Sequence, residues 1–222
     1  MKKLVLLALC FSFAFASYGQ IINEFHYDNA GGDVGEFVEV YVAGPVFPAN
    51  ISDYEVVRYN GSNGSVYGTN TLGNNFGTDA CNNRYYVIEY PANGLQNGSP
   101  DGLALVDDGG TLIQFISYEG SFMATAGPAV GAGMSTDVGV SETGGSPVGG
   151  SIEWTGVSWA INLGPDTRGA ENANVDPGSA CVPGAAVPTL GEWGLIILFL
   201  LILNIGTVFF IRRRNILAGQ TA

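Results

Sequence analysis

Short runs of alternating apolar and polar residues, separated by Gly, Asn, Asp and Pro, recur along residues 20–175. A two-residue period predicts β-strands, because successive side chains of a strand point to opposite faces. Residues 37–42, for example, place Val38, Val40 and Val42 on one face. The 3.6-residue apolar period of an amphipathic helix does not occur in this stretch. The pattern therefore predicts an all-β fold.

The first predicted strand begins at Ile21 and is expected to have one apolar and one polar side. Ile21, Phe25 and Tyr27 would face one way. Glu24 and His26 would face the other way. Strands of antiparallel sheets commonly have one face on the core and one toward solvent.

Two loops, residues 60–64 and 107–110, are expected to close hairpins, because Gly, Asn and Asp tolerate positive φ. Seven to nine short strands pack most readily as a two-sheet sandwich. The other predicted strands are 54–59, 65–67, 85–90, 103–106, 111–118, 152–154 and 157–161.

The C-terminal part of the chain has a different pattern. In residues 195–211, fourteen of seventeen side chains are Leu, Ile, Val or Phe. A helix over this run would be about 25 Å long, close to the roughly 30 Å hydrocarbon core of a bilayer. The run is predicted to be a transmembrane helix. The basic tail, 212–222, begins with Arg212, Arg213 and Arg214, which by the positive-inside rule place the C-terminus in the cytoplasm.

The N-terminal residues have the pattern of a secretory signal peptide. A basic start is followed by an apolar run over residues 4–15 and then by small residues. Residues 1–19 are assigned to this signal, with cleavage after Ala16 or after Gly19. A lipoprotein signal centred on Cys10 is disfavoured, because a leucine stands before it where a small residue is needed. The domain that follows is expected to be exported.

A Pro-, Gly- and Ala-rich linker, residues 176–187, leads to a short polar motif. The motif consists of Pro188, Thr189, Leu190, Gly191, Glu192, Trp193 and Gly194. With the apolar run and basic cluster behind it, the motif resembles the IPTL-CTERM protein-sorting domain, with Val187 where that family usually has Ile. The resemblance implies that an exosortase-type transpeptidase processes the chain at the membrane and delivers the ectodomain to the cell surface. An ordinary membrane anchor is the alternative, since it needs only the helix and the arginines.

Without its two ends the chain is strongly acidic. Of the eight basic residues only Arg58, Arg84 and Arg168 lie between the signal peptide and the sorting motif, and 19 of the 20 acidic residues lie there too. The net charge of about −16 repels phosphate backbones. Nucleic acid is therefore excluded as a partner.

Two cysteines, Cys81 and Cys181, remain after the signal peptide. An even number in an oxidising compartment predicts one disulfide. The bond would close a loop of about 100 residues and add up to about 4.7 kcal/mol in the chain-entropy model. Two free or intermolecular thiols are the alternative, because Cys181 lies in the predicted linker.

Separated segments of the domain share a second resemblance. They are INEFHYD at 22–28, GEFVEV at 35–40, YEVVRYNGSNG at 54–64, ISYEG at 116–120 and TRGAEN at 167–172. These segments resemble a bacterial lamin-tail domain, with Arg168 where a Pro is common. The resemblance implies an immunoglobulin-like β-sandwich. It also implies a binding or architectural module, because lamin-tail domains are mostly of that kind.

Candidate chemistry within the domain is sparse. His26 is its only histidine, beside Glu24 in a predicted strand, and such a residue is more often at the surface or half-buried than a catalytic base. Asp28, Asp33 and Glu36 in a Gly-rich turn are candidate calcium ligands, because Ca²⁺ takes six to eight oxygens. Asp is also favoured in such turns for backbone reasons alone.

The sequence therefore predicts a non-enzymatic cell-surface protein that requires no cofactor. Its domain would serve adhesion, envelope architecture or binding of an extracellular ligand. Its other partners would be the membrane and a sorting transpeptidase of the exosortase type. A secreted hydrolase accessory, a cryptic hydrolase and a calcium-binding surface module are the alternatives.

Overall fold

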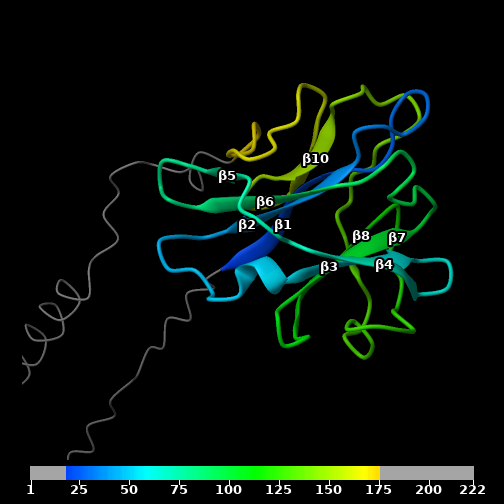
Figure 1. Cartoon of the computed structure of the whole chain (residues 1–222). Coiled ribbons are helices and arrows are strands. Elements are labelled where there is room, and N and C mark those ends of the chain that lie inside the picture. Colours follow the sequence, from blue (N-terminus) through cyan, green and yellow to red (C-terminus); the bar gives the residue numbers. More distant parts are fainter. Residues whose placement is uncertain (1–18, 176–222) are drawn as a thin grey trace, which may run out of the picture. The chain divides into compact units, whose positions relative to one another are not determined.

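The computed structural model describes residues 19–175 (Figure 1). The predicted signal peptide up to residue 18, the linker, the sorting motif and the transmembrane helix lie outside the described residues. The described part is all-β, as predicted, and its strands form two sheets with one 3₁₀ turn.

The two sheets have six and five strands. The first has the order β11-β10-β1-β2-β6-β5, and the second has the order β4-β3-β7-β8-β9. Neighbouring strands are antiparallel except for β8 and β9. The bounds are β1 (Gln20–His26), β2 (Phe37–Val42), η1 (Ile51–Asp53), β3 (Glu55–Asn60), β4 (Ser65–Thr71), β5 (Gly77–Thr78), β6 (Arg84–Glu89), β7 (Asp101–Val106), β8 (Leu112–Tyr118), β9 (Thr136–Asp137), β10 (Ser151–Trp154) and β11 (Trp159–Asn162).

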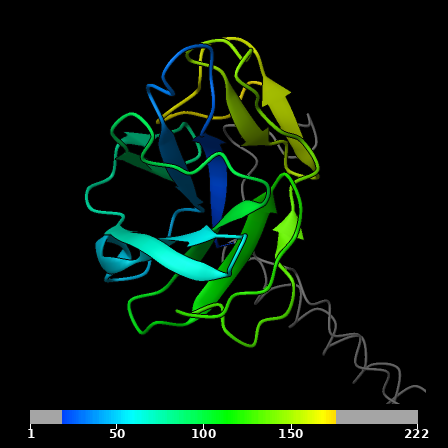
Figure 2. The ribbon, with the colours of Figure 1, turned by 90° about the vertical axis from the view of Figure 1, so that its right-hand side faces the viewer.

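The sheets face each other across one apolar core. Figures 1 and 2 show the layer of β1, β2 and β6 lying opposite the layer of β3, β7 and β8. The core cluster takes Val38, Val40 and Val42 from β2 and Leu103 and Leu105 from β7, so it joins both sheets. The predicted alternation of β2 is confirmed. Burial of these side chains is the main term that stabilises the fold.

The prediction for the first strand is wrong at Ile21. The register between β1 and β2 shifts between Ile22 and Glu24, which is a β-bulge. A bulge adds one residue to one strand and so inverts the alternation on one side of it. Ile22, rather than Ile21, joins Phe25 and Tyr27 in the core, and Ile21 is half-buried on the opposite face.

Both predicted hairpins are confirmed. The first joins β3 to β4 and the second joins β7 to β8. Gly64 and Gly110 end these loops with φ values of 70° and 82°, in the left-handed region that glycine adopts without a steric penalty. The two-residue strands β5 and β9 lie at sheet edges and were not predicted.

Each sheet also has an outer face that another segment covers. On the five-stranded sheet, Tyr59 and Phe115 pack against Phe122 and Ala129 of the long loop after β8, which forms a second apolar cluster. On the six-stranded sheet the covering segment is the C-terminal stretch, residues 163–175, and the contacts are polar. This second outer face carries the candidate site.

Candidate functional site

Three glutamates lie side by side across the outer face of the six-stranded sheet. Glu24 of β1 is opposite Glu153 of β10 on one side and opposite Glu39 of β2 on the other. All three side chains are fully buried. Buried like charges in adjacent positions are destabilising unless hydrogen-bond donors meet them. We call this set the glutamate row.

The C-terminal segment supplies most of those donors from its backbone. The amide of Thr167 donates to Glu24 at 3.0 Å, and the amide of Gly169 donates to Glu39 at 2.6 Å. The amide of Asn174 donates to Glu153 at 2.6 Å. Each glutamate therefore holds a different part of one segment. Figure 1 shows this segment, in yellow to orange, on the side of the sheet away from β3 and β7.

Two asparagines connect the row to the segment. Asn172 donates from Nδ2 to the carbonyl of Trp154 at 2.8 Å and to the carbonyl of Asn23 at 3.0 Å. Its Oδ1 accepts from Nδ2 of Asn23 at 2.8 Å, and that same Nδ2 donates to Glu39. The result is a buried polar network that joins residues 149 positions apart in the sequence.

Burial raises the pKa of Glu39 and of Glu24. It raises the pKa of Glu39 to about 8, although hydrogen bonds from Gly169 and Asn23 oppose the shift. Burial also raises the pKa of Glu24, against hydrogen bonds from Ser151 and Thr167. The charged form of the row is thus costly, and the donors of the C-terminal segment are what make it tolerable.

His26 lies in a second buried network and is not at the surface or half-buried as predicted, since its side chain is 1% exposed. Its Nδ1 is 2.7 Å from Oε1 of Glu142, and its Nε2 is 2.7 Å from Nδ2 of Asn29. Burial lowers the pKa of His26, but the hydrogen bond and charge of Glu142 outweigh it, so the pKa is raised. Glu142 comes from the long Gly-rich segment between β9 and β10, which covers this end of β1. With both ring nitrogens engaged and no solvent access, His26 holds that segment in place.

The three predicted calcium ligands are not brought together. Asp28 and Asp33 are close, and burial, followed by the hydrogen bond and charge of Asp33, raises the pKa of Asp28 to about 6. The carboxylate of Glu36 instead accepts hydrogen bonds from the amides of Gly94 and Leu95. Across residues 19–175, no group of three or more His, Cys, Asp or Glu side chains is arranged to hold a metal ion.

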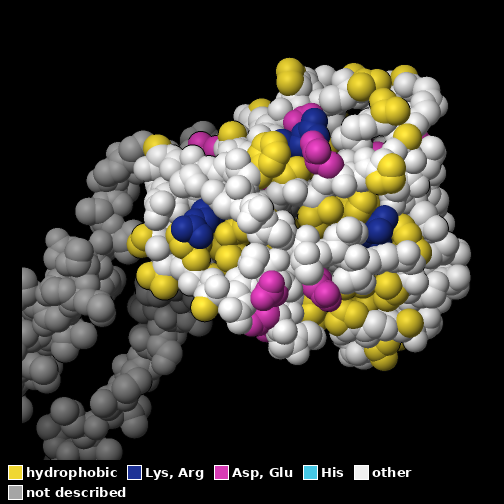
Figure 3. All heavy atoms as spheres, in the orientation of Figure 1, with side chains coloured by type: hydrophobic (Ala, Val, Ile, Leu, Met, Phe, Trp, Pro, Cys, Tyr) yellow, Lys and Arg dark blue, Asp and Glu magenta, His cyan; other side chains and the backbone are white. Residues whose placement is uncertain are grey.

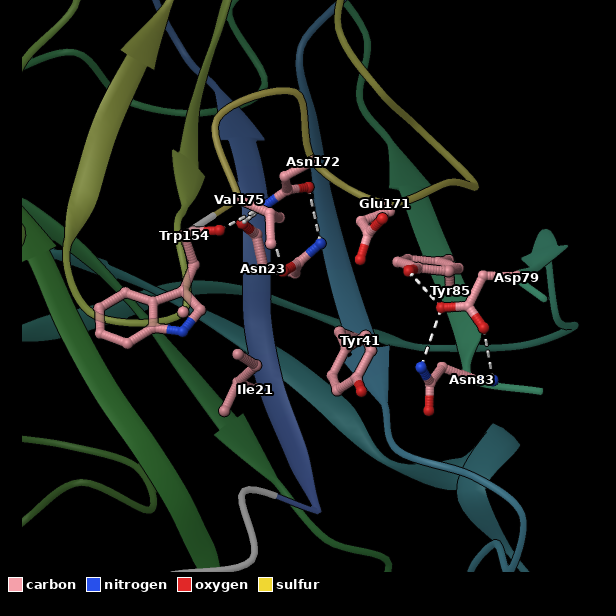
Figure 4. Close-up of a pocket in the computed structure, with 11 residues that line it drawn as sticks. Ile21, Asn23, Tyr41, Asp79, Asn83, Tyr85, Trp154, Glu171, Asn172 and Val175 are labelled. Carbon is pink, nitrogen blue, oxygen red and sulfur yellow. Dashed lines mark hydrogen bonds between the residues drawn. The ribbon is translucent and has the colours of Figure 1, made fainter. Parts of the chain in front are cut away.

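A pocket of about 240 Å³ lies beside the glutamate row (Figure 4). It is bounded by the outer faces of β1, β2 and β6, the turn between β5 and β6, the end of β10 and the C-terminal segment. Aromatic and aliphatic side chains form part of its wall, and amides and two carboxylates form the rest. The lining residues are Ile21, Asn23, Tyr41, Asp79, Asn83, Tyr85, Trp154, Gly156, Glu171, Asn172 and Val175.

Asp79 organises one end of the pocket. Its carboxylate accepts from the amides of Cys81 at 2.8 Å and Asn83 at 3.0 Å, and from the hydroxyl of Tyr85 at 2.9 Å. All these donors are neutral. Burial raises the pKa of Tyr41, and the charges of Asp79 and Glu171 raise it further, so both carboxylates act on the pocket.

Only one of the two cysteines of the predicted disulfide lies within the described residues. Cys81, in the turn between β5 and β6, is disulfide-bonded. Cys181 lies outside the described residues, and its pairing with Cys81 stays a prediction.

The comparison with known protein families matches the C-terminal end. Residues 185–215 match the IPTL-CTERM motif, which includes the predicted motif at 188–194 and the three arginines. The chain therefore carries an IPTL-CTERM sorting motif, and the match supports export, sorting to the cell surface and processing by an exosortase-type enzyme. No curated protein and no solved structure matches the chain. Within residues 19–175 no helix is long and apolar enough to cross a membrane, and the predicted span at 195–211 lies outside them.

Proposed function

We propose that this chain is an exported cell-surface protein whose β domain acts by binding or by structural association rather than by catalysis. The observation that carries the proposal is the IPTL-CTERM match at residues 185–215. In this proposal the signal peptide directs export, and the helix at 195–211 holds the chain in the membrane with the three arginines inside. The transpeptidase then removes the helix and leaves the domain at the surface.

We further propose that the domain is a lamin-tail domain with an immunoglobulin-like sandwich. Support comes from where its matching segments meet. Three of these segments contribute to the polar network on the six-stranded sheet. The first provides Asn23 and Glu24, the second provides Glu39, and the last provides Thr167 and Asn172. Segments 130 or more residues apart in the sequence thus share one structural role. That role explains why these residue types occur together.

The non-enzymatic assignment is supported by the state of His26. A general base must reach the proton that it removes, either directly or through one water. His26 is buried and hydrogen-bonded on both ring nitrogens. It is therefore poorly placed for the hydrolase alternative, and no other observation on the described residues favours that alternative.

The sorting motif separates sorting from simple anchoring. Replacement of Pro188, Thr189 and Leu190 by alanine should leave an uncleaved precursor in the membrane, because the transpeptidase would lose its recognition motif. Replacement of Pro177, Gly178 and Ser179 in the linker by alanine is the control and should leave processing unchanged. Intact-mass analysis of surface material reads out both. Mature surface protein that still carries residues 212–222 would refute the sorting proposal.

A further inference from the structure

The pocket beside the glutamate row has a composition that selects for one kind of ligand. Two of its described lining residues are acidic, Asp79 and Glu171, and none is basic. Figure 4 shows the carboxylate of Glu171 directed toward the space between Asn23, Tyr41 and Tyr85. The opposite part of the wall is formed by Trp154 and Ile21. The pocket thus combines negative charge with aromatic surface.

The three arginines of residues 19–175 do not line this pocket, and each contacts other groups. Arg84 stacks on Phe47 with its guanidinium carbon 3.8 Å from the ring centroid. Arg58 stacks on two tyrosines, and Arg168 stacks on a phenylalanine while also pairing with Asp166. In Figure 3 the basic side chains lie apart from one another, and one of them is in contact with acidic side chains. Residues 19–175 carry three arginines and eighteen acidic side chains, and no lysine.

We propose that this pocket binds the ammonium head of a small organic cation. A cation over an aromatic face is attracted by the ring quadrupole, and the attraction is stronger where water is excluded. Tyr41 and Tyr85 line the pocket, lie edge to face with ring centroids 5.7 Å apart, and bring aromatic surface beside the carboxylates. An anionic ligand would be repelled, and a neutral sugar would gain nothing from the charge.

The size of the pocket agrees with this ligand class. Its volume of about 240 Å³ is below the roughly 300–1,000 Å³ of pockets for drug-sized ligands. A trimethylammonium or alkylammonium head with a short chain is small enough to enter. The inference rests on the proposed binding function and names the class of ligand that the domain binds.

Calorimetric titration of the full-length chain in a nonionic detergent tests the inference with choline as the probe. Dimethylbutanol, the neutral carbon analogue of choline, has nearly the same shape and serves as the matched ligand. Choline should saturate the protein, and dimethylbutanol should bind about tenfold more weakly, because it lacks the cation–π and carboxylate terms. Equal binding of the two, or tighter binding of methyl glucoside, would overturn the inference. So would a choline titration that does not saturate.

Variants locate the binding in the pocket. Glu171→Gln removes one pocket charge and Tyr41→Leu removes one ring, and each should weaken choline binding by about three- to tenfold. Asp137→Asn removes an exposed charge from β9 on the other sheet and should leave binding unchanged. Near-ultraviolet circular dichroism checks that each variant is folded. Unaltered choline binding in both pocket variants would refute the site. The proposed sorting is tested separately, by the mass of the sorted protein.

Discussion

Asn172 is the residue whose removal should most clearly test the polar network. Its side chain is 5% exposed and bonds the C-terminal segment to β1 and β10. In Asn172→Ala the amide of Asn23 keeps its bond to Glu39, and the hydroxyl of Thr167 keeps its bond to Glu24. The loss therefore falls on the acceptors that Asn172 served, which are the carbonyls of Asn23 and Trp154 and Oδ1 of Asn23.

The size of the effect follows from those acceptors. A net hydrogen bond contributes about 0.5–1.5 kcal/mol, and a buried acceptor left without a partner costs about 1–3 kcal/mol. Some acceptors will find water in the space that the side chain leaves. We therefore expect Asn172→Ala to lower the free energy of unfolding by about 2–3 kcal/mol, which is roughly 4–12 °C in Tm for a domain of this size.

Asn174→Ala is the matched control. It makes the same chemical change two residues away, where the backbone amide donates to Glu153 but the side chain is exposed. It should change the free energy of unfolding by less than about 0.5 kcal/mol. Urea titration of the full-length chain in nonionic detergent, followed by tryptophan fluorescence, measures both variants. A loss in Asn172→Ala no larger than in Asn174→Ala would refute the role assigned to the network.

Two further predictions concern the same face of the molecule. Stability should fall as the pH rises from about 5 to about 9. Four groups have a raised pKa in the folded state: Glu24, Glu39 (about 8), Asp28 (about 6) and His26. Each group stabilises the fold fully below its unfolded pKa, and this contribution is lost as the pH rises through its folded pKa. A Tm measured by circular dichroism that is constant or rises over this range would contradict the assignment. Gly77→Ala should destabilise the domain by about 1–3 kcal/mol, because its Cβ would lie 1.9 Å from the carbonyl oxygen of Gly169. Gly32→Ala, which meets nothing within 4 Å, is the control in the same thermal assay, and equal Tm values for the two variants would refute the contact.

The sequence predicted the strands better than it predicted their faces. Alternation is a local property, so β2 and both hairpins followed from neighbouring residues. The bulge at Ile22 to Glu24 is set by the partner strand, and alternation alone placed Ile21 on the wrong face. The two-residue strands β5 and β9 carry too few residues to show a period.

The polar network was missed for a related reason. A glutamate in an alternating strand is ordinarily assigned to solvent, and Glu39 and Glu153 fit that expectation. Their burial depends on Gly169 and Asn174, which belong to no strand. Gly169 is 130 residues from Glu39 along the chain, and Asn174 is 21 residues from Glu153. The sequence did contain one signal, which is that acidic residues occur within these strands. It could not show that the glutamates are adjacent, because strand pairing places them side by side. His26 was misplaced in the same way, since Glu142 is 116 residues distant.

The attachment of the C-terminal segment also has a mechanical consequence. When the disulfide of Cys81 is reduced, a force that pulls on the C-terminal end of the chain enters the domain through residues 167–174. The amides of Thr167, Gly169 and Asn174 bond to β1, β2 and β10, which are interior strands of one sheet. Tension is thereby shared among three strands at once instead of peeling one edge strand away bond by bond. A domain tethered in this manner should extend abruptly and at higher force than one whose last strand is the sheet edge.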